Sequence, residues 1–116
     1  DDMAVPPQKV KILATAVRVP TLGCHAESVW VECEREVNLD RLLKSLAEFP
    51  GIALAKDPGS YVTGVEAVGQ DPVYVGRVRR DPDEKRALSL WIVSDNLGKG
   101  AALNAIQIAE RGLEVL

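Results

Sequence analysis

The sequence predicts an α+β fold in which helices pack on one face of a mixed, largely antiparallel sheet. Three observations support this class: β-branched segments recur along the chain, an amphipathic helix interrupts them early, and a second helical segment ends the chain. The predicted order is β-β-α-β-β-β-α, and successive strands without an intervening helix favour antiparallel pairing. A length of 116 residues is typical of one domain.

The first two strands are predicted over residues 9–19 and 28–37, after an acidic, proline-containing lead-in segment at residues 1–8. Within this first strand, the positions between Ile12 and Val17 are apolar at both odd and even numbers, which is typical of a strand covered on two sides. Pro20 and Gly23 interrupt the extended pattern. Residues 28–37 alternate between apolar and acidic side chains, so one face of this strand is expected to be exposed.

The first helix is the clearest local prediction. Asn38 is a favourable N-cap residue, and Phe49-Pro50-Gly51 gives a helix stop. Between them, leucines follow the i, i+3, i+4, i+7 spacing of a helix with one apolar face. These are Leu39, Leu42, Leu43 and Leu46.

The second half of the chain predicts short strands and a terminal helix. Strands are expected over residues 52–55, 73–79 and 87–93, the last two joined through Asp81-Pro82-Asp83 as a hairpin or a longer loop. Residues 61–70 have no clear period and are expected to form a loop with short extended pieces. Residues 97–116 are helical in pattern, with an apolar side formed by Ala102, Ile106, Ala109 and Leu113.

Composition excludes several classes of function. The chain carries 14 basic and 17 acidic residues, a net charge of −3, which gives no broad basic field for nucleic acid or an anionic membrane. The apolar run at residues 87–93 is far shorter than the ~20 residues that a membrane helix requires. Cys24 and Cys33 have no second pair, so neither a zinc ribbon nor a disulfide scaffold is expected, and no metal site is predicted. We expect a reducing, cytoplasmic location.

A candidate acid–base site lies at the interruption between the first two strands. His25 is the only histidine, and Arg18 precedes it closely. Pro20 and Gly23 between them allow the chain to fold back, which would place both side chains at one end of the sheet. A guanidinium binds a carboxylate or phosphate through paired hydrogen bonds, and imidazole is a common acid or base near neutral pH. The alternative is a surface histidine at the start of a strand.

Two neighbouring features are weaker candidates. Cys24 beside His25 suggests a nucleophile and its base, but neighbours in an extended segment point to opposite faces, which favours a small, half-buried structural residue. Residues 94–102 join the last strand to the last helix, and the free N–H groups of a helix start could meet a polar ligand there. The alternative is that Asp95 or Asn96 is only a helix cap.

Three strings resemble the C-terminal half of bacterial aspartate-semialdehyde dehydrogenases. They occur in the family's order over about Lys11 to Glu110, nearly the whole chain. The resemblance implies the C-terminal domain fold shared with glyceraldehyde-3-phosphate dehydrogenase-like enzymes. The strings are residues 75–81, residues 90–110, and Arg18-Val19-Pro20-Thr21-Leu22-Gly23-Cys24-His25-Ala26-Glu27 followed by Val29-Trp30-Val31-Glu32.

The same resemblance implies a reaction and a role for three residues. The family converts L-aspartyl 4-phosphate to L-aspartate 4-semialdehyde and phosphate with NADPH, through a cysteine thioacyl intermediate. This reaction lies on the route to diaminopimelate, lysine, methionine, threonine and isoleucine. By resemblance, Arg18 binds the substrate α-carboxylate, His25 is the catalytic acid and base, and Asn96 approaches the nicotinamide carboxamide of NADP. The family assembles as a homodimer.

The resemblance also implies that the chain is one part of a longer enzyme. Residues 9–116 match the C-terminal part of the dimerisation and catalytic domain, ending in a helix that returns to a nucleotide-binding half. The family's nucleophilic cysteine and that half are expected upstream of Asp1, so the chain alone is not expected to be active.

Two other interpretations remain open. The chain could be a non-catalytic dimerisation module or an inactive relative, although neither Arg18 nor His25 is needed to pack a sheet. N-acetyl-glutamyl-phosphate reductase shares chemistry and architecture, but the Arg18-to-His25 motif fits it poorly.

Overall fold

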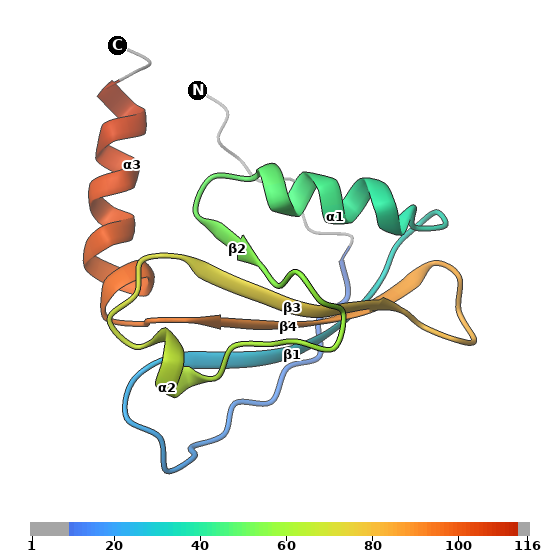
Figure 1. The fold of residues 1–116 in the computed structure, drawn as a ribbon, viewed down its shortest axis with the longest axis horizontal. Helices are drawn as coiled ribbons and strands as arrows, with labels where there is room; N and C mark the ends of the chain where they lie inside the picture. The colour runs from blue at the N-terminus through green and yellow to red at the C-terminus, as the bar shows by residue number, and fades with distance from the viewer. Residues whose placement is uncertain (1–9, 114–116) are drawn as a thin grey trace.

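The computed structural model describes residues 10–113 and contains a four-stranded mixed sheet with helices on it (Figure 1). The strands lie in the spatial order β1-β4-β3-β2. β4 is antiparallel to both β1 and β3, and β2 is parallel to β3. The predicted α+β class with a largely antiparallel mixed sheet is therefore confirmed. The strands are β1 (His25–Glu32), β2 (Ile52–Leu54), β3 (Val73–Arg80) and β4 (Ala87–Ser94).

In the described part of the chain, four helical segments connect or follow the strands. α1 packs against β2 and β3, while α3 continues from the end of β4 on the same side of the sheet (Figure 1). None of the helices within residues 10–113 has the length and apolar character needed to cross a membrane. The segments are α1 (Leu39–Glu48), α2 (Gly64–Ala67), the π-helical turn η1 (Gly98–Ala102) and α3 (Leu103–Leu113).

The first helix forms as its sequence predicts. The Asn38 side chain accepts a hydrogen bond from the Arg41 N–H at 2.9 Å, which satisfies one of the free donors of the first turn. Phe49 leaves the helical conformation with extended dihedrals. The strands predicted over residues 52–55, 73–79 and 87–93 are also present, with small shifts at their ends.

The predicted strand at residues 9–19 is wrong over its described part. Residues 10–19 belong to no strand, and Ile12 and Val17 are 73% and 75% exposed. A strand apolar on both faces needs cover on both faces, and the described chain supplies none. β1 also begins earlier and ends earlier than the predicted 28–37. The lead-in segment at residues 1–8 lies outside the described residues.

A short helix replaces part of the loop predicted at residues 61–70. Thr63 and Glu66 form a capping box, with the Thr63 N–H donating to Glu66 Oε2 at 2.8 Å. The indole N–H of Trp91 donates to the carbonyl of Val62 at 2.9 Å, so β4 holds the residue that precedes the N-cap Thr63. α2 is thereby fixed beside the sheet.

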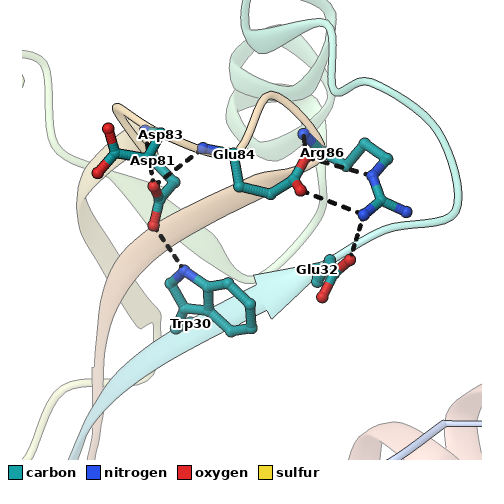
Figure 2. Close-up of polar contacts among 6 residues, drawn as sticks. All are labelled: Trp30, Glu32, Asp81, Asp83, Glu84 and Arg86. Atoms are coloured by element: carbon teal, nitrogen blue, oxygen red, sulfur yellow. Dashed lines mark hydrogen bonds and ion pairs between the residues drawn. The ribbon is translucent and has the colours of Figure 1, made fainter.

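The turn between β3 and β4 is tied to β1 by a polar network. The Asp81 carboxylate accepts hydrogen bonds from the Trp30 indole N–H, at 2.9 Å, and from the backbone N–H groups of Asp83 and Glu84. Together these donors hold the pKa of the Asp81 carboxyl below its usual range. Arg86 bridges Glu84 and Glu32, with an Nη2 to oxygen distance of 2.6 Å to Glu32. Figure 2 shows all six residues of this network, namely Trp30, Glu32, Asp81, Asp83, Glu84 and Arg86.

Gly76 allows a close approach of two segments in the middle of the sheet. It pairs with Trp91 on β4, and a β-bulge follows it between Gly76 and Arg79. A Cβ at Gly76 would lie 2.8 Å from the Ser60 carbonyl oxygen and 3.2 Å from the Tyr61 Cα. Backbone atoms cannot yield as a flexible side chain can. The chain can therefore cross here only because the residue has no side chain.

Replacing Gly76 by alanine is expected to destabilise the chain by ~1–3 kcal/mol, because the added methyl group overpacks a site closed by backbone. Thermal or urea unfolding followed by circular dichroism measures this change. Gly112→Ala is the control, since a Cβ there meets nothing within 4 Å. Equal stability of the Gly76→Ala variant and the unchanged chain would contradict the packing described here.

Candidate active site at the end of β1 and β4

The β1–β4 ladder brings two of the predicted motifs to the same end of the sheet. His25 is the first residue of β1 and pairs with Ser94, the last residue of β4. Asn96 follows Ser94 by two positions, in the turn that leads to η1. The antiparallel register therefore places His25, where the Arg18-to-His25 motif ends, beside Ser94, where the segment at residues 94–102 begins.

The chain reverses direction before it reaches His25. The Thr21 N–H donates to the Val19 carbonyl at 2.8 Å, which makes a tight turn around Pro20. Gly23 and Cys24 then adopt φ values of 72° and 61°, in the left-handed region. Figure 1 shows the blue segment before β1 running below that strand and turning back into it. The predicted fold-back of this connector is therefore present.

Arg18 and His25 lie on the two arms of this reversal and are both exposed. Within residues 10–113, no hydrogen bond or ion pair engages either side chain, and none joins the two. The structure thus brings together His25 and the Asn96 turn but does not bring Arg18 into contact with His25. Both side chains are accessible to solvent.

Cys24 has the environment of an unreactive thiol. Partial burial raises the pKa of the Cys24 thiol, and the negative charge of Asp95 raises it further. The thiolate is the nucleophilic form of cysteine. A raised pKa therefore disfavours Cys24 as a nucleophile, in agreement with the structural interpretation of this residue.

Asp95 is a buried carboxylate directly after β4, with only 7% of its surface exposed. Its Oδ1 accepts the N–H groups of Leu97 at 2.7 Å and Gly98 at 3.0 Å, and its Oδ2 accepts the Gly69 N–H at 2.6 Å. The N–H groups of Gly98, Gly69 and Leu97 hold the pKa of the Asp95 carboxyl below its usual range. The carboxylate is therefore ionised at neutral pH, stabilised by donors from two different segments.

Asn96 carries a buried hydrogen-bond acceptor in its side chain. Its Oδ1 is buried and has no hydrogen-bond partner among the described residues. A buried amide oxygen without a donor is costly, and such atoms are uncommon in folded proteins. An amide donor of a ligand would satisfy it.

Sequence reasoning did not identify the part that Asp95 plays. Its position at a strand-to-helix turn, three residues before Gly98, gave the signal of a local cap, and that local part is present. The bond to Gly69 joins positions 26 apart in the chain. No local pattern could have predicted it.

The described residues offer no group of three or more histidine, cysteine or acidic side chains placed to hold a metal ion. A surface hollow of about 400 Å³ is lined by other residues, among them Arg77, Arg79 and Trp91. An apolar groove of about 500 Å³ lies between α1 and the sheet. Neither contains the predicted site residues.

The fold is that of the sheet domain of a dehydrogenase. The structure of aspartate semialdehyde dehydrogenase II from Vibrio cholerae, complexed with ASA, superposes with a TM-score of 0.74 at 41% identity, over 80% of this chain and 28% of that chain. A probable aspartate-semialdehyde dehydrogenase from Pseudomonas aeruginosa also gives 0.74, at 40% identity, over 78% of this chain and 27% of that one.

The chain belongs to the semialdehyde dehydrogenase family, since the model of its dimerisation domain matches residues 2–99. The aspartate-semialdehyde dehydrogenase of Shewanella violacea is 47% identical over 97 residues, 83% of this chain and 29% of the relative. That of Bacillus subtilis is 43% identical over 104 residues, 87% of this chain and 30% of the relative. These findings confirm the resemblance to aspartate-semialdehyde dehydrogenases. The chain spans about 30% of the length of these curated relatives.

Proposed function

We propose that residues 9–116 are the C-terminal part of the catalytic and dimerisation domain of an NADP-dependent aspartate-semialdehyde dehydrogenase. The proposed reaction reduces L-aspartyl 4-phosphate to L-aspartate 4-semialdehyde and releases phosphate. The observation that supports this most directly is the β1–β4 register, which joins His25 and the Asn96 turn at one end of the sheet. Both belong to the strings that resemble the family.

His25 is the proposed acid and base. In the direction of reduction, a cysteine from the rest of the enzyme displaces phosphate to form a thioacyl group, and hydride addition gives a thiohemiacetal. His25 would take the cysteine thiol proton as phosphate leaves and return it to the oxyanion that hydride addition creates. It would then take the hydroxyl proton back as the thiohemiacetal splits into the aldehyde and the cysteine thiolate. An exposed imidazole at the first residue of an edge strand has room for a substrate beside it.

Arg18 is proposed to bind the α-carboxylate of the substrate. Its guanidinium is exposed and makes no ion pair among the described residues, so its paired donors are available. Because the connector between Arg18 and His25 reverses direction, the two side chains approach a substrate from separate arms of one loop. This arrangement suits a small amino acid derivative that carries its carboxylate at one end and its reacting carbonyl at the other.

Asn96 is proposed to contact the nicotinamide ring. The carboxamide of a nicotinamide cofactor has an N–H donor, and the buried Asn96 Oδ1 lacks one among the described residues. The residue present therefore fits this group. When bound, NADPH supplies the hydride for the reduction. Asn96 would orient the ring and takes no part in proton transfer.

The remaining catalytic parts are proposed to come from the rest of a longer polypeptide, with a homodimer as the working assembly. The match to a dimerisation domain and the 29–30% coverage of the curated relatives support this. Below, "the complete protein" means this chain joined to its nucleotide-binding portion.

The complete protein is expected to form NADPH from NADP when given aspartate semialdehyde and inorganic phosphate, which is the reverse reaction. The ultraviolet absorbance of NADPH follows the rate. Omission of phosphate is the control, because phosphate must attack the thioacyl group to complete turnover. No NADPH from the complete protein, or equal rates from residues 1–116 alone, would contradict the proposal.

A further inference from the structure

The segment Thr63–Gly69, here called the α2 turn, packs directly behind the residues that lead into His25. A Cβ built on Gly23 would lie 3.0 Å from Val68 Cγ2, and one built on Gly64 would lie 3.4 Å from the Cys24 Cβ. The α2 turn therefore lies close against both left-handed residues that precede β1. Any movement of this turn changes the support of the bend that presents His25.

A hydrogen bond to Asp95, the residue after β4, holds the α2 turn at this end of the sheet. Asp95 Oδ2 accepts the Gly69 N–H at 2.6 Å, and Gly69 has φ 74°, so its N–H is directed by a conformation that favours glycine. The other oxygen, Oδ1, is used by Leu97 and Gly98 in the turn that carries Asn96. One carboxylate thus joins the supports of two proposed site residues.

We propose that Asp95 is a positioning residue, which fixes His25 through the α2 turn and Asn96 through the η1 turn. The inference rests on the proposed function and assigns to that site a residue which touches neither substrate nor cofactor. Two separate bonding directions from one buried carboxylate would set the relative placement of the acid–base group and the nicotinamide contact. Small misplacements of reacting groups lower rates steeply, by up to ~100-fold for about 1 Å.

Asp95→Asn separates the two halves of this arrangement. The asparagine keeps an oxygen for the Leu97 and Gly98 N–H groups but presents an NH₂ donor to the Gly69 N–H, which breaks only the α2 bond. In the complete protein, kcat is expected to fall ~10- to 100-fold, with the KM values for aspartate semialdehyde and NADP within about twofold. Asp95→Ala removes all three hydrogen bonds and is expected to raise the KM for NADP as well.

Amide hydrogen exchange on residues 1–116 tests the bond between Asp95 and the Gly69 N–H independently of enzyme activity. The Gly69 amide is expected to lose protection in Asp95→Asn while the Gly98 amide keeps it. Asp57→Asn is the matched control, because Asp57 Oδ1 accepts the Gly59 N–H at 2.9 Å in an exposed turn with no longer-range bond. This variant is expected to change neither kcat nor exchange at Gly69.

Three results would overturn the positioning role. They are unchanged protection at Gly69 in Asp95→Asn, lost protection with an unchanged kcat, and a KM effect as large as the kcat effect. Failure of the proposed function looks different. In that case the unmodified complete protein forms no NADPH, whereas the exchange experiment still reports whether Asp95 holds the α2 turn.

Discussion

Replacing His25 by alanine in the complete protein is expected to lower kcat ~100- to 10,000-fold, the range that a positioned acid or base contributes. Without the imidazole, the cysteine thiol must lose its proton to water and the thiohemiacetal must do the same. His25 is exposed at the edge of the sheet, so its removal leaves no cavity. Steady-state rates of NADPH formation across a range of pH values measure the effect.

The variant His25→Asn serves as the control for shape. Asparagine can donate and accept hydrogen bonds but does not titrate, so it is expected to be nearly as slow as alanine. The free energy of unfolding of both variants should lie within about 0.5 kcal/mol of that of the unmodified chain, as for other surface substitutions. A kcat within tenfold of the unmodified protein in His25→Ala would remove the acid–base role.

Replacing Arg18 by lysine is expected to raise the KM for aspartate semialdehyde ~10- to 100-fold, with a smaller fall in kcat. Lysine keeps the positive charge but loses the planar pair of donors that matches a carboxylate. Hydrogen bonds to charged groups contribute ~1.5–3 kcal/mol, which corresponds to this range of affinity. Initial rates at varied semialdehyde and fixed phosphate and NADP give both constants.

Arg35→Lys is the matched control for that change. Arg35 is an exposed arginine in the segment between β1 and α1, away from the turn around Pro20. The Arg35→Lys substitution is expected to leave kcat and the KM for aspartate semialdehyde unchanged. If Arg18→Lys behaves like Arg35→Lys, Arg18 does not bind the substrate carboxylate.

Elements whose stability is local were predictable from the sequence. α1 has its leucine stripe and its Asn38 cap within a dozen residues, and β3 and β4 join through a short acidic turn. Residues 10–19 have the same quality of pattern, yet they form no strand because a strand depends on partners elsewhere in space. The capping box of Thr63 and Glu66 was readable, but a helix of four residues has no apolar period to accompany it.

The site was predictable to a similar degree. Pro20 and Gly23 indicated the reversal before His25, and the structure adds a second left-handed residue, Cys24, which only the dihedral angles reveal. The pairing of His25 with Ser94 and the Asp95–Gly69 bond each join residues that are far apart in sequence. Such long-range contacts leave no periodic trace. The roles of Arg18, His25 and Asn96 stay predictions until the variants are assayed.

The fastening of β1 near both of its ends has a mechanical consequence. Asp81 and Arg86 hold Trp30 and Glu32 at one end, and the α2 turn supports the bend into the other end. A strand held near only one end can separate from its neighbour one hydrogen bond at a time, starting from the other end. Because β1 is held near both ends, its separation from β4 requires these contacts to break together with the ladder of backbone hydrogen bonds, which hinders exchange of β1 with the same strand of another copy.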